Sequence, residues 1–74
     1  MEVKPYYGWY NWDTWAVNLW LCNSEYEYYA AVKLAKVNDI DGLLVLAMQL
    51  IPLEEKVNWT NVNWNEIVDN LVTQ

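Results

Sequence analysis

The side chains of this sequence that could perform acid–base chemistry are carboxylates, and six of them come in close pairs. The pairs are Glu25/Glu27, Asp39/Asp41 and Glu54/Glu55. Catalysis by two carboxylates also needs a supporting base or a third group that orients them, and the sequence shows neither. All three pairs fall where a helix is expected to begin, and carboxylates there cap backbone N–H groups and oppose the helix dipole. We therefore expect no enzyme activity from them.

Nucleophilic and metal chemistry find little support in the remaining side chains. Cys22 is the single cysteine, and the chain has no histidine to activate it or to share a zinc ion. Free cysteines are commonly buried, so we expect Cys22 to be a small buried apolar residue. The stretch 39–42 resembles the start of a calcium loop, which needs Gly at its sixth and Glu at its twelfth position. Leu44 and Leu50 stand there instead, so the sequence predicts no metal site and no cofactor.

The charge balance narrows the choice of partner. The formal net charge is −6, and the four basic residues are all lysines. Phosphate backbones are bound by clustered Lys and Arg, so direct binding to nucleic acid is not expected, whereas a basic protein surface would be attracted. The longest apolar run, residues 43–53, is far shorter than the roughly 20 residues of a membrane-spanning helix. With no export signal visible, we expect a cytoplasmic protein without a membrane partner.

Residues 12–22 are expected to form the helix around which the chain is organised. One face of it, at the i, i+3, i+4, i+7, i+8 spacing, carries Trp12, Trp15, Ala16, Leu19 and Trp20. A buried Trp contributes roughly 150–250 Å² of contact, so this face predicts much of the core. Thr14 falls off the face, and Asn11 is the expected N-cap.

Three further helices complete the predicted architecture. Their apolar periodicity and start signals place them at about residues 24–37, 40–51 and 63–72. Each has capping residues at its start: Ser24 with Glu27 as a capping box, Asp39 or Asp41, and Asn63. In the helix at 24–37, one stripe carries Tyr26, Tyr29, Ala30 and Leu34, and a neighbouring stripe carries Tyr28, Val32 and Ala35.

The first ten residues contain no helix signal. Pro5 and Gly8 interrupt them, and the aromatic side chains around Gly8 are too apolar for a free tail. We expect an irregular arm that packs back onto the helices. The sequence thus predicts an all-α fold: a compact bundle of about four short helices with an irregular aromatic N-terminal arm, in a single domain spanning residues 1–74.

The helix expected at 40–51 is almost entirely apolar. Between Gly42 and Ile51 only Gln49 is polar, and a helix that is apolar on all sides is either central or covered by a partner. Three other short helices can hardly enclose it in so small a chain. We therefore expect an oligomer seam, as in a homodimer, or a partner contact, at Val45, Met48 and Leu53.

Both ends of the sequence resemble a family of small phage, plasmid and prokaryotic proteins. Residues 11–20 read Asn-Trp-Asp-Thr-Trp-Ala-Val-Asn-Leu-Trp, which is similar to the family's opening, Asn-aromatic-x-Thr-Trp-x-Val-x-Leu-Trp. Residues 62–71 read Val-Asn-Trp-Asn-Glu-Ile-Val-Asp-Asn-Leu, which is similar to its closing helix, Val-Asp/Asn-Trp-x-Glu-Ile-Ala-x-Asn/His-Leu. The middle of this chain is shorter than the family's. The resemblance implies a mobile-element origin and an all-α fold. It implies no catalytic residue, because the family has no assigned activity.

The interpretation that fits these features is a small acidic protein of a mobile element that binds another protein and is not an enzyme. The partner would be a host defence nuclease, such as a CRISPR effector, blocked at its basic nucleic-acid-binding surface. The expected contact residues are carboxylates at helix starts and one adjacent aromatic: Glu25, Glu27, Tyr28, Asp39, Asp41, Glu54 and Glu55.

Two other functions stay open. One is a homo-oligomeric structural or assembly accessory protein with no inhibitory role, joined through the apolar helix at 40–51. The other is a binder of a small molecule in an aromatic pocket near Trp9, Trp12 and Tyr26. The charge of −6 is also compatible with simple solubility.

Overall fold

The computed structural model describes residues 6–73. Within them the chain forms the α-helices α1 (Trp12–Leu21), α2 (Glu25–Lys36), α3 (Ile40–Leu50) and α4 (Trp64–Val72). Two short 3-10 helices, η1 (Leu53–Glu55) and η2 (Trp59–Asn61), lie in the connection between α3 and α4. The predicted all-α bundle is confirmed, and each helix begins and ends within one residue of its predicted position.

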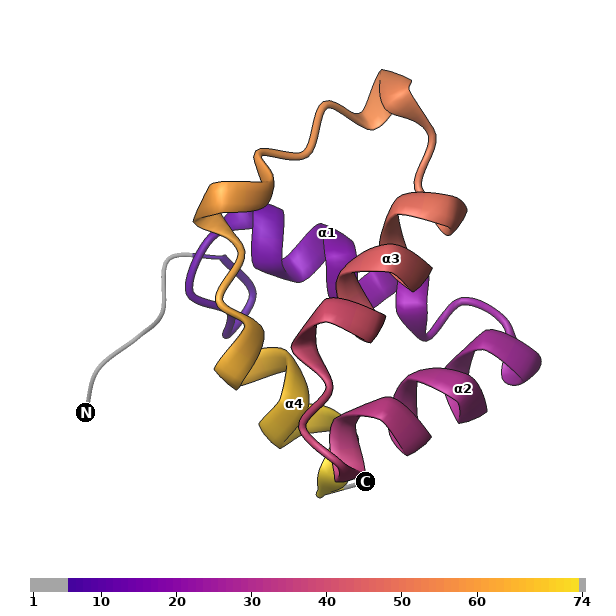
Figure 1. The fold of residues 1–74 in the computed structure, drawn as a ribbon. Coiled ribbons are helices and arrows are strands. Elements are labelled where there is room, and N and C mark those ends of the chain that lie inside the picture. Colours follow the sequence, from indigo (N-terminus) through magenta and orange to yellow (C-terminus); the bar gives the residue numbers. More distant parts are fainter. Residues whose placement is uncertain (1–5, 74) are drawn as a thin grey trace.

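The four helices pack around one another so that α2 contacts both α3 and α4, and α1 contacts α3 and α4. The Cα radius of gyration is 11.6 Å, close to the roughly 11 Å expected for a folded chain of this length. Figure 1 shows α2 along one edge of the bundle. The connection through η1 and η2 leaves the end of α3 and arches back to the start of α1.

Side-chain caps fix three of the four helix starts. Oxygens of Asn11, Asp39 and Asn63 each accept the backbone N–H three residues further on, as predicted. The prediction of a capping box at the start of α2 is wrong. Ser24 makes no cap to a backbone N–H; its hydroxyl donates to Glu27 Oε2 at 2.6 Å. The Glu27 carboxylate accepts this hydrogen bond, so the serine side chain is held by Glu27 and not by a backbone N–H of the first turn.

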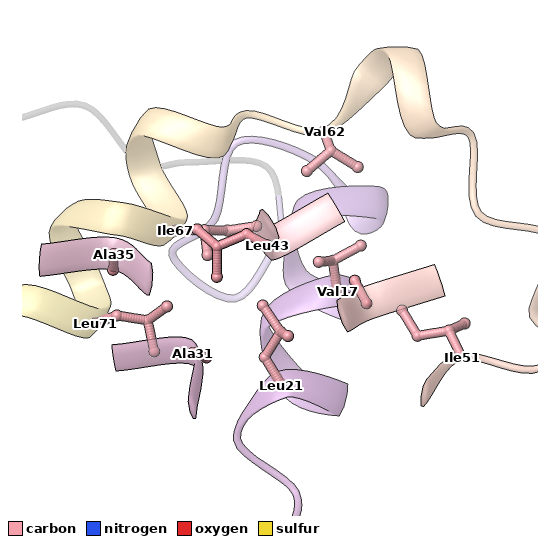
Figure 2. Close-up of a cluster of buried hydrophobic side chains, with 10 residues drawn as sticks. Val17, Leu21, Ala31, Ala35, Leu43, Ile51, Val62, Ile67 and Leu71 are labelled. Carbon is pink, nitrogen blue, oxygen red and sulfur yellow. The ribbon is translucent and has the colours of Figure 1, made fainter. Parts of the chain in front are cut away.

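The buried core consists of small and medium aliphatic side chains. It contains Val17, Leu21, Ala31, Ala35, Leu43, Ala47, Ile51, Val62, Ile67 and Leu71. In Figure 2, side chains from all four helices meet in this cluster. Its alanines come from α2 and α3, where a small side chain lets neighbouring helices approach closely.

The prediction that the tryptophan face of α1 supplies much of the core is wrong in its details. All six are half-buried, and four of them, Trp9, Trp20, Trp59 and Trp64, pack against the outside of the aliphatic cluster. On α1 the buried side chains are Thr14, Ala16, Val17 and Leu21, whereas Leu19 is 49% exposed. The buried face is therefore rotated from the predicted one, because helices spaced by alanines leave no central volume for an indole ring.

Thr14 is fully buried, although the sequence placed it off the buried face. Its Oγ1 donates to Asn11 Oδ1 at 2.7 Å and accepts from the Asn63 backbone N–H at 2.9 Å. Asn11 Nδ2 donates to the Asn61 carbonyl at 2.7 Å. We call these four residues the polar junction. It ties the start of α1 to the end of η2 and the start of α4.

The part of the N-terminal arm that the structure describes packs against the bundle, as predicted. The ring centroids of Tyr6 and Tyr7 lie 5.1 and 5.8 Å from that of Trp15. The Tyr10 N–H donates to Glu66 Oε1 at 2.9 Å, which fastens the arm to α4. Residues 1–5 of the predicted arm lie outside the described residues.

Candidate functional site

An apolar cleft of about 210 Å³ opens where α3 ends. Its lining comes from the last turn of α3, the proline after it, η1 and the start of η2: Met48, Ile51, Pro52, Leu53, Lys56, Val57 and Trp59. We call it the α3 cleft. In Figure 1 the chain segment that lines it, from the end of α3 through η1, lies away from α2 and α4.

Pro52 explains why the chain turns at this place. Proline cannot continue an α-helix, and it holds the residue before it in an extended conformation. Ile51 accordingly has φ −91° and ψ 120°. After η1, Lys56 adopts the left-handed conformation at φ 55°, and its N–H donates to the Leu53 carbonyl at 3.1 Å. The chain therefore folds back and brings Trp59 towards the end of α3, where both line the cleft.

The rim of the α3 cleft carries large apolar side chains in contact with solvent. Leu53 is 94% exposed, and Met48 is 50% exposed. Val45, 54% exposed, lies one turn before Met48 on α3, so the two share a face. Contiguous exposed apolar side chains commonly mark a surface that binds another protein. The structure thus places all three predicted seam residues at the surface.

The size of the α3 cleft favours a side chain over a small molecule as its occupant. Pockets for cofactors and drug-sized ligands measure roughly 300–1,000 Å³ and hold several convergent polar groups. This cleft is smaller, and Lys56 is the single charged residue in its lining. It can bury one large apolar side chain of a protein partner, with Leu53 packing beside it.

The predicted contact residues do not gather into one patch. Glu25 and Glu27 begin α2, Asp39 and Asp41 begin α3, and Glu54 and Glu55 form part of η1. At 1.5 Å per residue, α2 separates the first two pairs by about 18 Å and α3 separates the last two by about 16 Å. Tyr28, half-buried on α2, has an interaction partner. Only the pair in η1 lies beside the α3 cleft, and both of its members are exposed.

Two carboxylates, one of them a predicted contact residue, have local structural roles. Asp39 Oδ1 accepts the Gly42 N–H at 2.9 Å and caps α3. Asp13 Oδ1 accepts the Asn58 N–H at 2.8 Å, which fastens the connection before η2 to the first turn of α1. These bonds show that the acidic residues differ in what they do, so net charge alone does not define the site.

A second hollow, of about 350 Å³, lies between the arm and α4. Gly8, Trp9, Glu66 and Asn70 line it. Trp12 is not part of this lining, and Tyr26, 83% exposed, projects from α2. The structure therefore does not bring the three aromatics of the predicted small-molecule pocket together.

Cys22 caps the C-terminal end of α1 and is half-buried. Burial raises the pKa of its thiol above the ordinary value, so the unreactive protonated form dominates near neutral pH. Among residues 6–73, no three His, Cys, Asp or Glu side chains are grouped so that they could hold a metal ion.

The sequence did not point to the residues that form the walls of the α3 cleft, chiefly Ile51, Val57 and Trp59. The sequence contains two signals for the α3 cleft: a proline directly after an apolar helix, and a tryptophan in the connection that follows. Neither signal shows that the chain folds back over the end of the helix.

Comparison of the chain with models of known families, with curated proteins and with solved structures gave no match. The resemblance to the phage and plasmid family stays a prediction. In the part of the chain that the structure describes, no helix has the length and apolarity to cross a membrane.

Proposed function

We propose that this chain acts by binding another protein and is not an enzyme, with the α3 cleft as the contact site. The observation that carries the proposal is Leu53, a large apolar side chain that is 94% exposed on the rim of an apolar cleft. An exposed leucine beside a cleft of side-chain size is suited to anchor a protein interface.

The charge around the cleft favours a basic partner over a second copy of the chain. Glu54 and Glu55 follow Leu53 directly and are exposed; together with Lys56, which lines the cleft, they leave one net negative charge at the rim, and the whole chain carries −6. A second copy would bring the same excess of negative charge to the contact. A partner that presents an apolar side chain among Lys and Arg would satisfy both the cleft and its acidic rim.

The partner class that we propose is a host defence nuclease, such as a CRISPR effector, in keeping with a mobile-element origin. Such enzymes hold nucleic acid in grooves rich in Lys and Arg. The acidic rim would compete with phosphate for those side chains, and the apolar anchor would add affinity that charge alone does not give. The chain would then act as a partial mimic of nucleic acid and inhibit the enzyme.

The test is inhibition of DNA cleavage by purified CRISPR effectors and restriction nucleases, with displacement of labelled DNA as a second readout. We expect the unmodified chain to inhibit at least one of them, more strongly at low salt. Leu53→Ser should abolish inhibition. Glu54→Lys combined with Glu55→Lys should weaken it and flatten its salt dependence.

Val72→Ser is the matched control, because Val72 is an exposed aliphatic residue (41%) at the end of α4, away from the cleft. It should leave inhibition unchanged. If no nuclease is inhibited, the inhibitor function is wrong. If Leu53→Ser and the charge reversals inhibit as well as the unmodified chain, the α3 cleft is not the contact site.

A further inference from the structure

The outer face of α2 carries large side chains that the fold leaves in solvent. Tyr26 is 83% exposed, Tyr29 is 57% exposed, and Val37, the C-cap of the helix, is 73% exposed. The tyrosines were expected to form one stripe of this helix, yet the side chains that α2 buries are Ala31 and Ala35. The two tyrosines face away from the core, whereas Leu34 of the same predicted stripe packs against it.

Charge on this face is divided between the two ends of the helix. Successive residues of an α-helix are about 100° apart, so the outer face contains, in chain order, Glu25, Tyr26, Tyr29, Lys33, Lys36 and Val37. The carboxylate lies at the start of α2 and both lysines lie in its last turn. A face with this division is complementary to itself when two copies pair in opposite directions.

We propose that two copies of the chain pair through this face, with their α2 helices antiparallel about a two-fold axis near residue 31. In a two-fold pair, each flank of the face meets the same flank of the other copy. On one flank, Glu25 then lies opposite Lys36 of the second copy. On the other flank, Tyr26 lies opposite Val37 of the second copy.

The middle of the face fits the same register. Tyr29 and Lys33 lie closest to its midline, and antiparallel pairing about residue 31 places each opposite the other. A lysine over a tyrosine ring makes a favourable cation–π contact. One axis position thus satisfies the acid–base pair, the apolar pair and the aromatic–cation pair together.

The dipole of α2 explains part of this pattern but not all of it. Acidic residues at a helix start and lysines at its end also stabilise a helix on its own. That effect does not account for two exposed tyrosines on the same face. Four tyrosine rings, two per copy, each burying at most about 150–250 Å², supply roughly half of the 1,200 Å² at which specific interfaces begin, because Tyr29 is already partly covered in the monomer. Val37 and the aliphatic stems of Lys33 and Lys36 would add to this area. We therefore expect a weak dimer, with a dissociation constant of micromolar order.

The dimer face and the α3 cleft are separate surfaces. Figure 1 shows α2 along one edge of the bundle, near the start of α3, whereas η1 follows the end of α3. Pairing through α2 leaves the cleft of each copy free. The dimer therefore does not rest on the proposed function, and either proposal can fail alone. Self-association would also add buried surface to a chain of 74 residues that has a single cysteine and so no internal disulfide.

Sedimentation equilibrium between about 1 and 500 µM tests the proposal. We expect a monomer–dimer equilibrium for the unmodified chain. Tyr26→Ser with Tyr29→Ser should raise the dissociation constant by about 100-fold or more, since it removes all four rings. Glu25→Lys or Lys36→Glu alone should each raise it by about tenfold, because each opposes like charges at two symmetric positions.

The decisive variant is the charge swap, Glu25→Lys with Lys36→Glu on the same chain. It restores both ion pairs of an antiparallel dimer and should return the dissociation constant to near that of the unmodified chain. It cannot restore a stabilising helix-dipole effect, because the swapped charges both interact unfavourably with the dipole of α2. Circular dichroism confirms that each variant is folded.

Three outcomes would overturn the proposal. The first is a monomer at 500 µM. The second is a charge swap that dimerises no better than the single variants. The third is a dimer that the tyrosine variant leaves intact and that Val45→Ser with Met48→Ser abolishes, which would place the contact on α3.

Discussion

The start of α1 and the end of α3 both adjoin the long connection between α3 and α4, and they differ in the polarity of their side chains. At the polar junction, the buried side chain of Thr14 is hydrogen-bonded to Asn11 and to the backbone of Asn63. At the α3 cleft, apolar side chains line a hollow and Leu53 is almost fully exposed. The junction pairs its buried polar groups by hydrogen bonds within the protein, whereas the cleft leaves apolar surface exposed to water.

This difference separates the structural role of the junction from the binding role that we propose for the cleft. In residues 6–73, every buried side-chain nitrogen or oxygen has a hydrogen-bond partner, so the junction has no free polar group to offer a ligand. The cleft exposes apolar side chains, and covering them would be favourable by roughly 25 cal/mol per Å² of apolar surface buried. Substitutions in the junction should therefore change stability, and substitutions on the rim of the cleft should change binding.

The largest loss of stability should come from the core that supports both regions. Leu43 on α3 is fully buried, and Leu43→Ala should lower the free energy of unfolding by about 2–5 kcal/mol through lost contact and a cavity. Urea unfolding followed by Trp fluorescence measures it. Val45→Ala, on the exposed side of the same helix, is the control and should cost less than about 1 kcal/mol. Equal costs would contradict the assignment of the core.

The next largest effect should come from Thr14→Val, which keeps the shape of the side chain and removes its hydroxyl. The Asn63 N–H loses its acceptor, so we expect a loss of about 1–3 kcal/mol in urea unfolding. The control is Thr60→Val, since the Thr60 hydroxyl bonds Asn58 Oδ1 on the surface. If the two substitutions cost the same, burial of the junction does not matter.

Leu53→Ser should be close to neutral for stability, within about 0.5 kcal/mol, because the side chain is already in solvent. An unchanged stability together with the expected loss of nuclease inhibition would show that the rim of the cleft, unlike the junction, acts in binding and not in folding. Thermal unfolding by circular dichroism measures it. A loss above 1.5 kcal/mol would show that Leu53 packs against the fold, and the rim of the cleft would need a different description.

The smallest effect should come from Cys22, at the end of α1 far from the junction. Burial raises the pKa of its thiol, so the unfolded chain ionises at a lower pH than the folded chain. The contribution of Cys22 to stability is therefore present below the pKa of the unfolded state and is lost as pH rises through the pKa of the folded state. Urea unfolding at pH 7 and pH 10 should show a slightly smaller decline for Cys22→Ser than for the unmodified chain.

The fold was predictable from the sequence because its signals are local. Asn11, Asp39 and Asn63 each cap a helix within three residues, and apolar periodicity set the helix lengths. The core was less predictable, because the sequence shows that Trp12 and Val17 are both apolar but not which of them faces the other helices. The site was least predictable, since Trp59 reaches the end of α3 only through the turn at Pro52 and Lys56.

The sequence by itself determined four short helices, their caps, the acidic charge and an apolar third helix, because these depend on neighbours along the chain. Only the tertiary structure decided that Thr14 is buried, that the tryptophans are only half-buried, and that Tyr26 and Tyr29 of α2 face outward. The reason is steric: small alanines on α2 and α3 let the helices pack closely, and this packing decides which side chains fit inside and which remain exposed.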